Sequence, residues 1–208
     1  MLDRTRRLWD LQNRHLGDRH RLFAAVARAI DASRVLYPGS FVDIAPSFVW
    51  PAVTYVDVDR RAKQFFDDVD GVHELLTEHG ADPAARQVRF LQADYHLDLD
   101  LADGEFDLLI SLYAGFISDP CTRFLRPGGH LLVNPSHGDV AMASIDPRYE
   151  LQAVVRSRGG EYAVSARNLD AYLVQKTAQD LTPAWLRERG RGVAYTRSPF
   201  AYLFRRVE

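Results

Sequence analysis

Short apolar runs alternate with stretches of helical periodicity along most of the chain. Near-continuous aliphatic runs bounded by Gly, Pro or Asp are typical of strands that are buried on both faces of a parallel sheet. Helical patterns lie between these runs, which favours connections that cross over the sheet. The pattern therefore predicts a Rossmann-like, doubly wound α/β fold with a mostly parallel sheet. Its strands are expected at 34–37, 53–57, 88–92, 107–112 and 130–134, and the helices between them at 59–66, 72–79 and 120–125.

The two ends of the chain follow different patterns. Residues 2–33 predict two N-terminal helices, with a break at Gly17 and Asp18 as the N-cap of the second helix. Beyond residue 134, two apolar segments flank Gly159-Gly160, which is typical of a hairpin. The C-terminal part is thus expected to add antiparallel edge strands. These lie at 149–156, 161–166 and 200–206, with a helix at 183–189 before the last strand.

Composition narrows the class of protein. The chain has 208 residues, of which 47% are hydrophobic, and its net charge is −2, so we expect one globular domain and no nucleic acid as a partner. A single cysteine excludes an internal disulfide and a cysteine-based metal site, and the histidines lack metal-ligand spacing. No apolar stretch is long enough for a membrane helix, and the polar start predicts no signal peptide. A cytoplasmic location is expected.

Candidate chemistry lies where the predicted strands end. In doubly wound sheets, ligands bind beyond the carboxyl ends of the strands. Polar or flexible residues follow each of the five strands at this edge: Tyr37, Gly39, Ser40, Asp57, Asp94, Tyr113 and the segment 134–139. The sequence thus places a candidate ligand site at one edge of the sheet.

Four segments of the parallel half resemble the class I S-adenosylmethionine-dependent methyltransferases: 53–57, 90–94, 104–111 and 124–134. The resemblance implies S-adenosylmethionine as cofactor. By this resemblance Asp57 holds the ribose hydroxyls and Asp94 faces the adenine amino group. One carboxylate can accept from two hydroxyls, which suits the first role. The implied organisation is a single domain, with a helical cover at 1–33, a nucleoside-binding half at 34–134 and an antiparallel part at 135–208.

The first loop departs from the family pattern. The resemblance implies that Tyr37, Gly39 and Ser40 contact the cofactor, yet Tyr37 stands where the family has an acid. Phe41 stands where a glycine would let the backbone approach a ligand. Asp43 could supply the missing acid. These departures keep an alternative open, a methyltransferase-like fold without cofactor that binds a ligand or a protein. If the two aromatic rings filled the crevice, a nucleoside would have no space.

Two further residues are candidates for catalysis. His137 could act as a general base near neutral pH, with Asp139 orienting its ring. Tyr113 follows the fourth strand, where the resemblance implies contact with the substrate. For both residues, a turn or a packing role is the simpler alternative. A small-molecule acceptor is expected because no extra domain could hold a polymer, and a homo-oligomer stays open. A nicotinamide-dependent oxidoreductase is disfavoured because the first loop lacks Gly-x-Gly-x-x-Gly.

Overall fold

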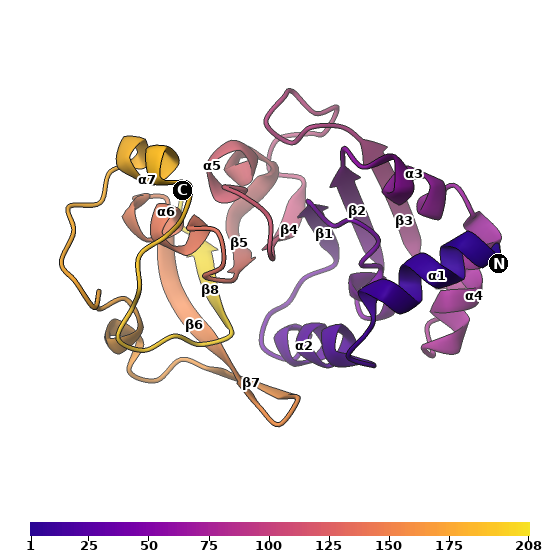
Figure 1. Cartoon of the computed structure of the whole chain (residues 1–208), viewed down its shortest axis with the longest axis horizontal. Helices are drawn as coiled ribbons and strands as arrows, with labels where there is room; N and C mark the ends of the chain where they lie inside the picture. Colours follow the sequence, from indigo (N-terminus) through magenta and orange to yellow (C-terminus); the bar gives the residue numbers. More distant parts are fainter.

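A single eight-stranded sheet organises the computed structural model, which describes residues 1–208 (Figure 1). The strand order is β3-β2-β1-β4-β5-β8-β6-β7. The first five strands along the chain pair in parallel, and β8 lies antiparallel between β5 and β6. The predicted α/β fold with antiparallel C-terminal edge strands is confirmed. The bounds are β1 Arg34–Pro38, β2 Ala52–Asp57, β3 Gln87–Gln92, β4 Phe106–Ser111, β5 Leu125–Val133, β6 Tyr149–Arg158, β7 Glu161–Ser165 and β8 Ala201–Arg206.

Helices cover both faces of this sheet because successive strand residues point to opposite sides. Leu108 and Ile110 join the core beneath α1 (Asp3–Gln12), α2 (Asp18–Ala27), α3 (Arg60–Phe66) and α4 (Val69–Glu78). Leu109, between them, joins the opposite core beneath α5 (Ser118–Cys121) and α6 (Asp139–Ile145). The remaining helices are α7 (Pro183–Arg189) and the short 3-10 helices η1 (Ala45–Phe48), η2 (Pro83–Ala85), η3 (Thr122–Phe124) and η4 (Leu169–Tyr172). None of the helices has the length and apolarity needed to cross a bilayer.

Local signals explain several element boundaries. Asp59 caps α3 by accepting from the Arg61 amide at 2.7 Å. Gly159 and Gly160 form the predicted hairpin turn, with φ of +60° and +80°. The prediction that Asp18 is an N-cap was wrong, because Gly17 takes that position with φ of +69° and Asp18 lies in the first turn. The helix predicted at 120–125 begins earlier, at Ser118, and ends in 3-10 geometry.

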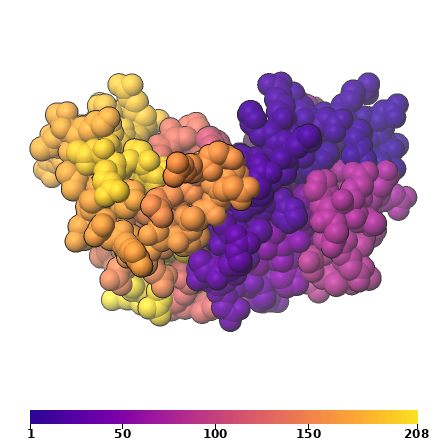
Figure 2. All heavy atoms as spheres, turned by 90° about the horizontal axis from the view of Figure 1, so that it is seen from below, coloured from indigo at the N-terminus to yellow at the C-terminus, as the bar shows by residue number.

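The N-terminal helices contact the C-terminal hairpin. Arg21 Nε donates to the Gly160 carbonyl at 2.7 Å, and the Tyr162 hydroxyl donates to Asp18 Oδ2 at 2.8 Å. Figure 2 shows the same junction from below, where the indigo N-terminal segment meets the orange hairpin. The first turn of α2 is therefore tied to the hairpin formed by β6 and β7.

Candidate functional site

The strand order reverses between β1 and β4, which places the ligand crevice of a doubly wound sheet at their carboxyl ends. β1 leads across to β2 on one side, and β4 leads to β5 on the other. Gly39 follows β1 and Asp57 ends β2, while Tyr113 follows β4 and Asn134 follows β5. Most of the site residues predicted from the sequence thus meet along one edge.

Asp57 holds the first loop in place. Its Oδ2 accepts from the Phe41 amide at 2.7 Å, and its Oδ1 accepts from the Asp59 amide at 2.8 Å. Phe41 has φ of +48°, in the left-handed region that favours glycine. Each carboxylate oxygen has a second lone pair, so Asp57 can still accept from a ribose hydroxyl.

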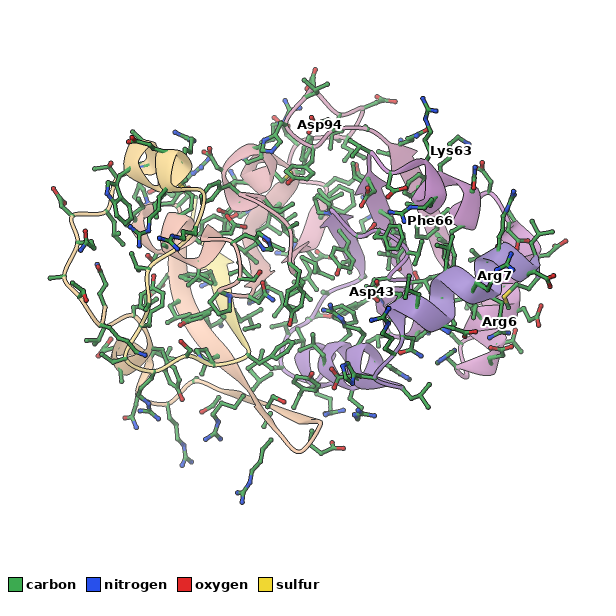
Figure 3. All side chains as sticks on the ribbon, in the orientation of Figure 1. Arg6, Arg7, Asp43, Lys63, Phe66 and Asp94 are labelled. Atoms are coloured by element: carbon green, nitrogen blue, oxygen red, sulfur yellow. The ribbon has the colours of Figure 1, made fainter.

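Tyr37 and Asp43 support this loop from beneath. The Tyr37 ring is buried against Phe23 and Tyr55, and its hydroxyl donates to Asp43 Oδ2 at 3.2 Å. Asp43 is itself buried, which raises the pKa of its carboxyl group, and it lies 3.6 Å from Arg19 Nε. Figure 3 shows Asp43 inside the molecule, between the sheet and the N-terminal helices. The suggestion that Asp43 replaces the family acid is therefore not supported.

The side chains of two predicted cofactor contacts are turned inward. Tyr37 and Ser40 are each 2% exposed, so only the backbone of this part of the loop can reach a ligand. The Phe41 ring lies beneath the Arg61 guanidinium, with 5.0 Å between the guanidinium carbon and the ring centroid. The rings of Tyr37 and Phe41 are therefore not the side chains that lie closest to Gly39.

Ala114 closes the crevice instead. A Cβ built on Gly39 would lie 2.7 Å from Ala114 Cβ and 3.9 Å from the Tyr95 ring. A Cβ built on the neighbouring Gly115 would lie 3.2 Å from the Tyr95 hydroxyl oxygen. Ala114, in the β4–α5 loop (residues 112–117), thus lies directly against the backbone of Gly39. The carboxylates of Asp57 and Asp94 are acceptors of the kind that a nucleoside's hydroxyl and amino groups need, but a ligand can lie against Gly39 only when Ala114 withdraws.

The β4–α5 loop is anchored at both ends. The Tyr113 amide donates to Asn134 Oδ1 at 3.2 Å, and the Ile117 amide donates to Asp139 Oδ2 at 3.2 Å. Asp139 is buried and also accepts from the hydroxyls of Ser111 and Ser118, at 2.6 and 2.5 Å. Asp139 therefore fastens this loop. The prediction that it orients His137 was wrong, because its oxygens face away into the α5–α6 interface.

Asn134 and Ser136 join the two predicted catalytic residues. Ser136 Oγ donates to Asn134 Oδ1 at 2.7 Å and lies 2.8 Å from His137 Nδ1. The serine has one proton, which goes to Asn134, so His137 Nδ1 must carry the proton of the second bond. This assignment leaves His137 Nε2 as an exposed acceptor. Tyr113 and His137 thus share Asn134 as a common support, although no direct contact links their side chains.

The other two strand-associated acids differ in role. Asp94, half-buried on the loop after β3 (Figure 3), accepts from the His96 amide at 2.9 Å through Oδ1. Asp107 lies at the opposite edge of the sheet, where it accepts from the Ser33 and Arg34 amides and from Arg126 Nε. Burial alone would raise the pKa of Asp107, but these donors outweigh it and lower the pKa to about 2. Asp107 ties strands together and is remote from the crevice.

Comparison with known proteins yields solved structures only. No family model matches the chain, and no curated protein matches it. The YcgJ protein from Bacillus subtilis is 20% identical, with 61% of this chain and 54% of that chain covered and a TM-score of 0.42. The chain covers about half the length of the first structures that it matches.

Two further matches are to methyltransferases. The N-methyltransferase NodS from Bradyrhizobium japonicum, in complex with S-adenosyl-L-homocysteine, is 13% identical over 92% of this chain and 87% of its own, with a TM-score of 0.47. The O-methyltransferase TomG from Streptomyces achromogenes, in complex with S-adenosylmethionine, is 15% identical over 79% and 87%, with a TM-score of 0.45. These proteins are of the class that the sequence resembles. Because identities lie below 25% and TM-scores below 0.5, the overlays assign no residue of this chain a role.

Proposed function

We propose that this protein is an S-adenosylmethionine-dependent methyltransferase that acts on a small molecule. One observation carries the proposal: Asp57 ends β2 and Asp94 follows the adjacent strand β3, beside the point where the strand order reverses. The continuous sheet supports a single domain over 1–208, with 1–33 as cover, 34–134 as nucleoside-binding half and 135–208 as antiparallel part. A cytoplasmic location belongs to the same proposal.

The proposed cofactor contacts come from three loops. Asp57 accepts from the ribose hydroxyls through its free lone pairs, and Asp94 Oδ2 accepts from the adenine amino group. The backbone around Gly39, with Tyr37 and Ser40 held rigid below, lies along the cofactor tail. Bound there, S-adenosylmethionine supplies a methyl group on a positively charged sulfur. The protein then has mainly to align the acceptor with that methyl group.

His137 and Tyr113 provide the acceptor side of the site. His137 Nε2 takes the proton that the acceptor loses, which the tautomer fixed by Ser136 permits. The exposed Tyr113 side chain forms a wall for the acceptor. Asn134 links the two residues, because its side-chain oxygen accepts from the Tyr113 amide and from Ser136, which contacts His137.

The contact between Ala114 and Gly39 sets a condition on this proposal. The β4–α5 loop must move between its anchors at Asn134 and Asp139 before the cofactor can lie against Gly39. The same contact favours a second candidate function, a methyltransferase-like protein that binds a ligand or partner without cofactor. Measured methyl transfer or cofactor binding distinguishes the two.

Calorimetric titration with S-adenosylmethionine tests the proposal through Asp57→Asn. The asparagine can still accept from the Phe41 amide but loses the charge that strengthens a bond to a ribose hydroxyl. We expect the dissociation constant to rise about tenfold, a difference of about 1.4 kcal/mol. Asp98→Asn is the matched control, because Asp98 is 87% exposed and pairs only with Arg123 on the surface. Equal affinity of the Asp57 variant and the control would contradict the assigned contact.

A further inference from the structure

A cavity of about 300 Å³ lies beside Tyr113, between the α1–α2 turn and the segment that leads into β8. Its walls include Gln12, Asn13, His15 and Arg19 on the N-terminal side, and Tyr113 and Phe200 on the other. The volume is at the lower end of the range for small-molecule sites. Tyr113, one of the two candidate catalytic residues, lines this cavity, and its backbone amide donates to Asn134.

Arg19 is the unusual residue in this cavity. Its side chain is 21% exposed, yet none of its N–H groups makes a hydrogen bond within the chain, and Nη1 is sealed from water without an acceptor. The nearest carboxylate is Asp43, whose Oδ2 lies 3.6 Å from Arg19 Nε. Because Nη1 is sealed, only the exposed part of the guanidinium can meet a ligand in the cavity, and its N–H groups there have no acceptor within the chain.

The surroundings of Arg19 leave room for an anion. The guanidinium carbon lies 4.9 Å from the centroid of the half-exposed Tyr113 ring, which orients its plane. Asp18 also lines the cavity, but its oxygens already accept from the Tyr162 hydroxyl and from Arg21. Gln12 and Asn13 add neutral amide donors. Of Asp18 and Arg19, the two charged residues that line the cavity, only Arg19 has no hydrogen-bonded partner.

We propose that this cavity binds the carboxylate group of a small organic acid through Arg19, with Tyr113 and the α1–α2 turn enclosing the rest of the molecule. A guanidinium makes strong charge-assisted hydrogen bonds to carboxylate oxygens, and Arg19 can make such a bond through the part of its guanidinium that faces the cavity. The carboxylate site does not depend on the proposed function. Only the further assignment of the bound acid as the methyl acceptor rests on it. The orphaned donors of Arg19 and the cavity in front of Tyr113 carry this assignment.

Thermal unfolding of the full chain with benzoate, benzamide or inorganic phosphate, without cofactor, tests the site. We expect benzoate to raise the Tm and the neutral benzamide, of similar shape, to leave it unchanged. Arg19→Gln should raise the benzoate dissociation constant at least tenfold, and Arg14→Gln, an exposed arginine outside this cavity, should not change it. If Arg19→Gln does not fold, Arg19→Gln with Asp43→Asn removes both charges of the pair together.

The outcomes separate this inference from the proposed function. Equal effects of benzoate and benzamide, no effect of benzoate, or unchanged benzoate affinity in Arg19→Gln would each overturn the site. Stabilisation by phosphate alone would overturn the choice of a carboxylate. Cofactor binding without benzoate binding refutes only this inference, and benzoate binding without cofactor binding refutes only the methyltransferase.

Discussion

Gly39→Ala probes the contact that closes the crevice. Gly39 has φ of +66°, and a side chain in this left-handed region costs about 1–2 kcal/mol. The new methyl group would also lie 2.7 Å from Ala114 Cβ, well inside the usual separation of about 3.5–4.0 Å between carbon atoms. Such overpacking costs about 1–3 kcal/mol more. We therefore expect the free energy of unfolding to fall by about 2–5 kcal/mol.

Gly80→Ala is the matched control for backbone strain. Gly80 has φ of +76°, and a Cβ built there has no neighbour within 4 Å, so only the conformational cost of about 1–2 kcal/mol applies. Ala114→Gly in the Gly39→Ala background should remove the overlap and restore the difference of about 1–3 kcal/mol. Urea unfolding followed by tryptophan fluorescence measures all these free energies. Equal losses for Gly39→Ala and Gly80→Ala would refute the closed crevice.

Two further predictions concern charge and catalysis. Asp107 has a folded-state pKa lowered from 3.8 to about 2, so its stabilisation is present above about pH 4 and is lost as pH falls toward 2. Asp107→Asn should thus lower the free energy of unfolding by up to about 2 kcal/mol at pH 7. The difference from the natural protein should vanish near pH 2. A difference that does not depend on pH would contradict this prediction. His137→Ala should lower the turnover of methyl transfer about 100-fold or more while leaving the dissociation constant of S-adenosylmethionine unchanged, and full turnover would exclude a general-base role.

The centre of the sheet could be predicted from the sequence because strands such as β1, β2 and β4 are buried on both faces. A continuous apolar run such as 107–112 is typical of a central parallel strand. The observed strand β4, Phe106–Ser111, lies within one residue of the expected bounds. The predicted bounds of α7 agree with the observed Pro183–Arg189, where Pro183 is the first helical residue and Gly190 is the C-cap. The helix α6 was not anticipated, since its first residue, Asp139, was interpreted as a partner of His137.

The candidate site was less predictable because its closure depends on contacts between loops. The sequence marked Phe41 as standing at a glycine position of the family, but its positive φ was found only in the structure. The approach of Ala114 to Gly39 spans two loops on neighbouring strands, and no local pattern encodes that separation. Arg19 lies in a helix with an ordinary amphipathic pattern, so only the fold reveals that it faces Asp43 and Tyr113.

The central claim is that Asp57 and Asp94 hold a nucleoside cofactor once Ala114 withdraws from Gly39. Calorimetric titration of S-adenosylmethionine into the natural chain and into Ala114→Gly tests this most directly. We predict saturable binding to both proteins, tighter in Ala114→Gly because the variant no longer has to move a methyl group from the crevice. The absence of heat from both proteins at about 1 mM cofactor, which corresponds to a binding free energy weaker than about −4 kcal/mol, would contradict the account.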